Sequence, residues 1–347
     1  MNELSGGMIM PMKRKEHAVT YRMRMAACLG LAVISYPVWL MLFHASVARS
    51  IPMWLAPLWL GLAFAVPLIG LGFAFRLSRI DLGALKGVRS LRRFAYGVIA
   101  APTLFTFLGV LNYMAGTPLP DLTLWSVLWG ALLILALAAP EEETRTPWPH
   151  LARWRVVHGI SGAILAMFVA FHLTNHLTGL IGPAAHKSVM AAGRTVYRSI
   201  LVEPLLVAAF IFQVVTGLRL AWHWSAERAN RFRVFQIATG FYLSLFILGH
   251  MNSVFIYARS FMKIDTDWMF AIGGPAGIIS DAWNIRLLPH YWFGAFFVLS
   301  HLAAGLRIVM LSHGVPAAAA NRLLLGGVAA SFTVSTAILL GMCGLRV

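Results

Sequence analysis

Long apolar runs alternate with short polar segments along the whole chain. A helix that crosses a bilayer needs roughly 20 mostly apolar residues, and nine runs meet that requirement. They fall at residues 22–44, 53–75, 93–115, 122–140, 152–178, 199–222, 232–258, 288–313 and 322–343. The pattern therefore predicts an all-α integral membrane protein with about nine transmembrane helices.

The composition supports this prediction. Apolar residues make up 59% of the 347 residues and charged residues 12%, with a mean hydropathy of +0.76. Soluble domains average about 25% charged residues. The net charge of +16 would suggest a nucleic-acid partner in a soluble protein. In a membrane protein it reflects basic cytoplasmic loops, so we expect a lipid bilayer and no nucleic acid as partner.

The basic residues also predict an orientation. Three segments that fall on the same side of the predicted spans carry many of them: Lys13, Arg14, Lys15, Arg76, Arg79, Lys86, Arg89, Arg92, Arg93, Arg228, Arg231 and Arg233. The loop at 116–122 has none. Basic loops stay in the cytoplasm, which places the N-terminus inside and the C-terminus outside a bacterial-type inner membrane. The basic N-terminal segment is interpreted as a signal-anchor because no cleavage site follows it.

A polar segment divides the chain into two predicted regions. Glu141–Glu143, Pro147 and Pro149 resemble a cytoplasmic linker. Residues 1–150 form a four-helix membrane region to which the sequence assigns no role. Residues 151–347 form a five-helix region.

Histidines are very unevenly distributed between the two regions. The first four spans contain one, at the end of a span (His44). The last five contain His158, His172, His176, His250, His290 and His301, with His223 at a boundary. Ionisable residues are rare inside membrane helices and usually face the bundle interior. The histidines are therefore the candidate functional residues.

The fifth span places three of them on one stripe. At 100° per residue, His158, His172 and His176 share one face, together with Gly162. His158 and His172 lie about 21 Å apart along the helix axis, in opposite leaflets. Glycine permits close approach of a flat macrocycle to the backbone.

The predicted depth of each side chain in the membrane indicates which polar residues on different spans could meet. His172 and His250 lie on two outward-running spans, both past the middle, whereas Gln213 and His301 match closer to the cytoplasm. Gly305 follows His301 by one helical turn. Two buried imidazoles at equal depth are what a bis-histidine heme b requires. A lone transmembrane histidine more often serves packing or hydrogen bonding, so the prediction rests on the pair.

The ordered motifs carry a family resemblance. They are VHGISG (157–162), HLTNHL (172–177), QVVTGL (213–218), GHMN (249–252) and HLAAGL (301–306). From Trp154 to about Leu345 the chain resembles the cytochrome b-type, five-helix membrane anchor of succinate dehydrogenases and fumarate reductases. The resemblance implies a heme-carrying subunit that transfers electrons and exchanges them with a quinone.

Ligand roles follow from the resemblance position by position. It implies that His172 and His250 ligate the iron of the outer heme and that His301 supplies one ligand of an inner heme. Gln213 occupies the position of the other inner ligand, and a carboxamide ligates heme iron poorly. The inner heme is therefore absent, five-coordinate or ligated differently, with His158 as the geometric candidate.

The resemblance also implies a quinone site and partner subunits. Glu203 matches the family's acidic residue near the outer quinone site, and Asn175 and His176 are further candidates. A structural alternative pairs Glu203 with Arg198. The family's partners are an iron–sulfur protein and a flavoprotein on the cytoplasmic face. This chain has no CxxC cluster, Rossmann glycine motif or flavin motif, so it would be the non-catalytic electron-transfer and anchor subunit.

Two other functions remain open at this point. One is a non-redox membrane protein that keeps the scaffold, such as a transporter, a sensor or an assembly factor. The Gln213 replacement and the four additional spans favour it. The other is a stand-alone cytochrome that passes electrons to an outer partner through the segment 259–287.

Overall fold

A computed structural model describes residues 9–80, 87–138 and 150–347, with side chains from Val19 onward. Every regular element in these ranges is a helix. Eight helical segments are long and apolar enough to cross a membrane: Val19–Val47, Met53–Ser78, Asp121–Ala138, Leu151–Leu180, Val202–Ser225, Arg231–Met262, Asn284–Ser312 and Ala317–Met342. The prediction of an all-helical chain with many potential spans is confirmed for these residues.

The elements follow each other without a strand in the described ranges. The first group comprises α1 (Ile9–Ile34), α2 (Tyr36–Val47), η1 (Met53–Leu55), α3 (Ala56–Ser78), α4 (Val88–Ile99), α5 (Ala101–Ala115) and α6 (Asp121–Ala138). The second comprises α7 (Leu151–Leu177), η2 (Thr178–Leu180), α8 (Pro183–Tyr197), α9 (Val202–Ser225), α10 (Arg231–Met251), the π-helix η3 (Asn252–Met262), α11 (Trp268–Ala271), α12 (Gly277–Ser280), η4 (Asn284–Arg286), α13 (Leu287–Ser312) and α14 (Ala317–Met342).

The third predicted span is not one straight helix. Residues 93–115 belong to α4 and α5, which meet at Ala100 with a bend of 69°. Pro102 stands in the first turn of α5. Proline has no backbone N–H, and its ring clashes with the carbonyl one turn earlier, so it breaks a helix at this point. Counting this bent pair as one span gives a total of nine.

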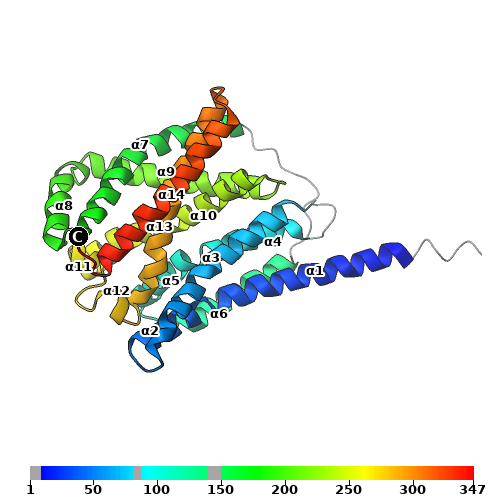
Figure 1. The fold of residues 1–347 in the computed structure, drawn as a ribbon, viewed down its shortest axis with the longest axis horizontal. Coiled ribbons are helices and arrows are strands. Elements are labelled where there is room, and N and C mark those ends of the chain that lie inside the picture. The colour runs from blue at the N-terminus through cyan, green and yellow to red at the C-terminus, as the bar shows by residue number, and fades with distance from the viewer. Residues whose placement is uncertain (1–8, 81–86, 139–149) are drawn as a thin grey trace, which may run out of the picture.

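An additional helix lies where the sequence suggested only a loop. The segment after the fifth predicted span forms α8, which contacts η2 and the short helix α11, and η2 in turn contacts α14 (Figure 1). The chain end is tied to the same region, because the Val347 backbone N–H donates to the Leu180 carbonyl at 3.0 Å. This end of the molecule is the outer end in the predicted orientation.

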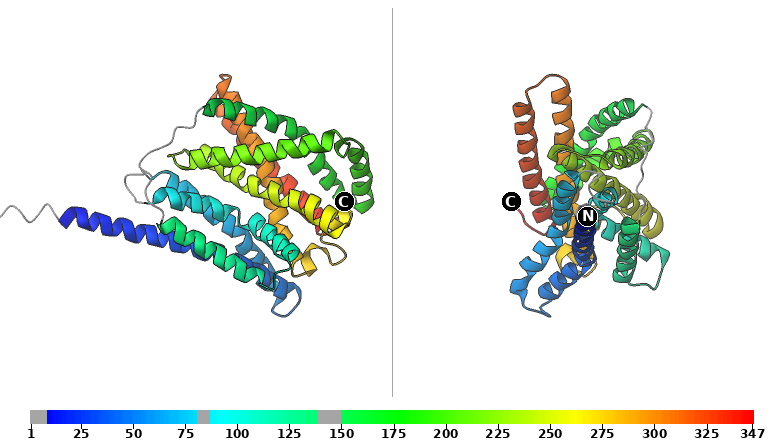
Figure 2. Two further views of the ribbon diagram at one scale, coloured as in Figure 1. Left: turned by 180° about the vertical axis from the view of Figure 1, so that it is seen from behind. Right: turned by 90° about the vertical axis from the view of Figure 1, so that its right-hand side faces the viewer.

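Four helices of the second group enclose the region where the histidines lie. In this ring α7 contacts α9, α9 contacts α10, α10 contacts α13, and α13 contacts α7. Helix α14 pairs with α13 as a hairpin on the flank (Figure 2). Helices α7 and α10 therefore face each other across the ring.

The two predicted regions pack against each other through a common hydrophobic core. Helices α3, α4 and α5 contact α10 on its other side. Phe64 of α3 lies with its ring centre 5.6 Å from Trp292 and 5.5 Å from Phe293 of α13. The proposed linker with Glu141–Glu143, Pro147 and Pro149 lies outside the described residues. Within those residues, one core serves both regions.

Arg92, interpreted above only as a topology signal, is completely buried at the end opposite α8. Its guanidinium donates to the Leu77 carbonyl at 3.0 Å and to the Ser225 carbonyl at 3.1 Å. It also reaches the carbonyl of Glu227. These carbonyls lie at the C-terminal ends of α3 and α9, where helices leave acceptors without intrahelical partners. Arg92 thus joins two helix ends.

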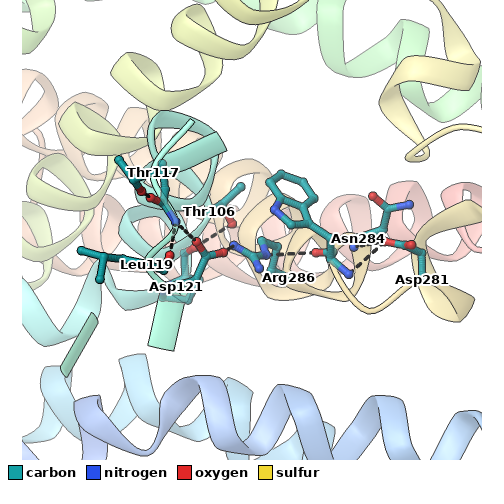
Figure 3. A network of polar contacts seen from close by, with 10 residues as sticks. Thr106, Thr117, Leu119, Asp121, Asp281, Asn284 and Arg286 are labelled. Carbon is teal, nitrogen blue, oxygen red and sulfur yellow. Dashed lines mark hydrogen bonds and ion pairs between the residues drawn. The ribbon is translucent and has the colours of Figure 1, made fainter. Parts of the chain in front are cut away.

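A second buried charge joins the two regions at the α8 end (Figure 3). Arg286, just before α13, donates to Asp121 at 2.8 Å, and Asn112 donates to the same carboxylate at 2.8 Å. The guanidinium of Arg286 also lies 4.4 Å from the centre of the Phe105 ring. A Cβ atom at Gly109 of α5 would stand 2.1 Å from a guanidinium nitrogen of Arg286. A larger residue at this position would therefore displace the guanidinium of Arg286.

Replacement of Gly109 by alanine is expected to destabilise the protein by roughly 1–3 kcal/mol, the usual cost of overpacking. The added methyl group would force the Arg286–Asp121 pair apart. Thermal unfolding in detergent measures the loss. Gly130→Ala in α6 is the matched control, because no atom lies within 4 Å of its added Cβ. Equal melting temperatures for both variants would contradict the prediction.

Candidate functional site

Five histidines gather toward the α8 end of the helix ring. They are His172 and His176 of α7, His186 of α8, His250 of α10 and His290 of α13. Ring centres lie 4.7 Å apart for His172 and His176, 5.9 Å for His172 and His250, and 5.4 Å for His176 and His186. His290 joins them through Phe246, 4.8 Å away.

The structure brings His172 and His250 together from opposite helices. Their ring planes are inclined by 71° and their centres are 5.9 Å apart. Bonds between a metal ion and an imidazole nitrogen are about 2 Å long. Two imidazoles that ligate one ion from opposite sides therefore have centres roughly 6 Å apart. The spacing of this pair matches that requirement.

Aromatic rings fix the orientation of both imidazoles. Phe168 stacks on His172 at 5.6 Å with an interplanar angle of 18°. Phe246 stacks on His250 at 5.7 Å with an angle of 8°. Neither imidazole makes a hydrogen bond to another described residue. A buried histidine with a purely structural role would be expected to make such a hydrogen bond. The donor set fits a heme, which needs only two axial ligands from the protein.

The inner position is arranged differently from the sequence-based expectation. The carboxamide nitrogen of Gln213 donates to the His158 carbonyl at 2.9 Å and to the Ser161 hydroxyl at 2.5 Å. Gln213 is thus bound to α7. A Cβ atom at Gly162 would stand 3.4 Å from this nitrogen, so the Gln213 side chain lies beside that glycine.

His158 and His301 both have a neighbouring threonine at Nδ1. His158 Nδ1 lies 2.7 Å from the Thr216 hydroxyl, which itself donates to the Phe212 carbonyl. His301 Nδ1 lies 2.9 Å from the Thr239 hydroxyl. Since each hydroxyl has a single proton and gives it to its own helix, it accepts from Nδ1–H. A neutral ring then keeps its lone pair on Nε2, the tautomer that ligates metals.

Glycines lie beside the inner histidines. A Cβ atom at Gly240 of α10 would be 3.0 Å from His301, and one at Gly217 of α9 would be 3.5 Å from His158. By contrast, no described atom lies within 4 Å of a Cβ at Gly305. The glycines next to the two inner rings are therefore Gly217 and Gly240. The roles of Gly162 and Gly305 beside a cofactor stay predictions.

The three quinone-site candidates separate into two places. Asn175 and His176 belong to the histidine cluster, and Asn175 donates to His186 at 3.2 Å. Glu203, at the start of α9, accepts two hydrogen bonds from Arg259, at 2.6 and 3.2 Å. Arg198, its partner in the structural alternative, donates instead to the Thr266 hydroxyl at 2.7 Å.

Sequence reasoning missed two residues of the cluster, His186 and Trp268, which lie outside the predicted spans. His290 was among the histidine candidates, and the structure buries it. A helical pattern in 183–197 could have pointed to His186. The contact of Trp268 with His186, 4.7 Å between ring centres, depends on chain segments about 80 residues apart and has no local signal.

The described residues contain no group of three or more histidine, cysteine or acidic side chains placed to hold a metal ion. Comparisons with protein-family models, with curated proteins and with solved structures find no match to this chain.

Proposed function

We propose that this protein is a membrane electron-transfer subunit that carries heme b and exchanges electrons with a quinone. The observation that supports this most directly is the His172–His250 pair, which has the spacing of two axial ligands and no hydrogen bonds to other described residues. A bound heme would supply reversible one-electron chemistry. The protein would contribute the two imidazoles and the aromatic rings of Phe168 and Phe246 that hold them.

The inner position supports a second site of different composition. His158 and His301 each retain an Nε2 lone pair, while Gln213 is held by α7. These two histidines, and not Gln213, are the inner ligand candidates. The number of hemes per chain measures whether the inner site is loaded.

The proposed function also implies a location in the membrane, an orientation and partner subunits. Eight or nine apolar helices are compatible with a multi-pass membrane protein. The basic loops favour a bacterial-type inner membrane with the N-terminus inside, which puts the His172–His250 pair near the outer face. Iron–sulfur and flavoprotein subunits would then dock on the opposite, cytoplasmic face.

One observation favours the second candidate function, a non-redox membrane protein on this scaffold. Gln213 of α9 donates to the His158 carbonyl and to the Ser161 hydroxyl, so a polar contact links α9 to α7 within the apolar bundle. A transporter, sensor or assembly factor could use such a fixed polar contact.

An absorption spectrum of the purified full-length protein separates the two functions. We expect reduced-minus-oxidised b-type bands and at least one heme per chain in a pyridine hemochrome assay. A protein expressed with sufficient heme that shows no such bands would refute the electron-transfer function and leave the non-redox one. Co-purification of flavin and iron–sulfur subunits would distinguish an anchor subunit from a stand-alone cytochrome.

A further inference from the structure

His186 of α8 is the centre of a polar layer above the proposed outer heme position. Asn175 donates to its Nε2 at 3.2 Å. The ring of His176 lies 5.4 Å from it and the ring of Trp268 4.7 Å from it, measured between ring centres. His176 in turn lies 4.7 Å from His172, the proposed ligand.

Four buried polar atoms of this layer have no hydrogen-bond partner. They are Asn175 Oδ1, His176 Nδ1, His186 Nδ1 and Trp268 Nε1. Asn175 is 5% exposed, and His186 and Trp268 are each 2% exposed. Buried polar groups in proteins are almost always hydrogen-bonded. Four unpartnered atoms at and around His186 indicate that a polar group of a ligand forms hydrogen bonds with this layer.

The hydrogen bond from Asn175 defines what His186 offers. Because His186 Nε2 accepts a hydrogen bond from the Asn175 amide, the proton of the neutral ring resides on Nδ1. Burial and the charge of Arg194 lower the pKa of His186, and the charge of Asp267 opposes them without reversing the direction. The neutral ring is therefore the prevailing form at pH 7. The indole nitrogen of Trp268 can only donate. His186 and Trp268 therefore present two N–H donors.

The charge and surface of this end define the class of ligand. The donors are neutral, and the nearby cations Arg194 and Arg198 already donate to Thr266. An anion would gain no free counter-charge from them. The elements that carry the layer expose large apolar side chains, with Ile181 66%, Val196 64% and Ile200 96% exposed. A neutral, lipid-soluble molecule with acceptor oxygens fits these conditions.

We propose that this layer binds the headgroup of a membrane quinone, with a quinone carbonyl oxygen accepting hydrogen bonds from His186 Nδ1 and Trp268 Nε1. This inference rests on the proposed electron-transfer function and gives its quinone a location. His176 lies between this site and His172 and contacts both. It excludes Glu203, whose carboxylate is held by Arg259.

Trp268 is held in place by close contact with the backbone of the chain. A Cβ atom at Gly179 would stand 2.1 Å from the Trp268 ring, so the indole lies directly against η2. Phenylalanine at position 268 would keep an aromatic ring in this contact and remove only the N–H donor and part of the ring. This makes Trp268→Phe a specific test of the donor.

The test uses the full chain in lipid nanodiscs and a benzoquinone with a short isoprenoid tail as the probe. Equilibrium binding of the probe and the heme spectrum are measured on the same samples. We expect Trp268→Phe and His186→Phe each to weaken binding about tenfold, the equivalent of one lost hydrogen bond. Heme content should stay unchanged, because His172 and His250 are intact.

Two matched variants serve as controls. Trp54→Phe alters a tryptophan that is 77% exposed, and Glu203→Gln alters the competing candidate. Both should bind the probe like the wild type. Three results would each overturn the inference: unchanged binding in Trp268→Phe, weakened binding in Glu203→Gln alone, or a heme-loaded wild type that binds no quinone. The third result would mean that the unpartnered polar atoms of the layer bind only water.

The outcome also separates this inference from the proposed function. A wild type without heme bands that still binds the probe through Trp268 would refute electron transfer and retain the quinone site. A wild type with heme bands and no probe binding would do the reverse.

Discussion

Replacing either His172 or His250 by alanine is expected to abolish the b-type absorption of the proposed outer heme. Each ring would supply one of the two axial ligands, and their centres lie only 5.9 Å apart across the helix ring. The loss should be one heme per chain in the pyridine hemochrome assay. The double variant should lose no more than either single variant, because both ligands serve the same iron.

The control for this prediction is another histidine of the same cluster. His290 is buried beside Phe246 but is not one of the paired rings, so His290→Ala should retain the outer heme. Circular dichroism and gel filtration of each variant would verify that the helices remain folded. Full heme content in His172→Ala and His250→Ala, with folding intact, would contradict the assignment of this pair.

Replacement of Arg92 by methionine is expected to cause the largest loss of stability, roughly 3 kcal/mol. Methionine keeps most of the side-chain length and removes the donors. The guanidinium is fully buried and donates to carbonyls at the ends of α3 and α9. Each buried carbonyl left without a donor costs about 1–3 kcal/mol. Thermal unfolding in detergent measures the effect.

An exposed arginine provides the comparison. Arg322 of α14 lies on the surface, and Arg322→Met should change the melting temperature little, as surface substitutions usually do. Arg92→Lys should fall between, because an ammonium group retains the charge but cannot spread its donors over two helix ends as guanidinium does. A melting temperature of Arg92→Met equal to that of Arg322→Met would contradict the buried-cap role.

Local patterns were sufficient for the helices but not for their breaks and contacts. The apolar runs placed eight potential spans to within a few residues, because crossing a membrane demands a long apolar helix whatever its neighbours are. The bend at Ala100 was missed although Pro102 is visible in the sequence. Proline does not always break a transmembrane helix, since neighbours can satisfy the freed backbone groups.

The histidine pattern likewise predicted some contacts and not others. Equal depth on two spans suffices to predict that His172 and His250 could meet. Once the depth of a membrane helix is fixed, only its rotation about its own axis and the identity of its neighbouring helices remain undetermined. The same reasoning paired Gln213 with His301, yet the carboxamide of Gln213 turned to the α7 backbone instead. A polar side chain in a helix bundle bonds to whichever acceptor its neighbour presents, and sequence spacing does not reveal the neighbour.

The amino-acid sequence alone determined the all-helical class, the potential spans and the concentration of histidines in the last five of them. These depend on hydrophobicity and helical period, which are local properties. Only the tertiary structure decided that Arg92 caps two helix ends, that Glu203 pairs with Arg259, and that His186 and Trp268 join the histidine cluster. Each of these contacts joins segments distant in the chain, so its energy is gained only when the helices have packed.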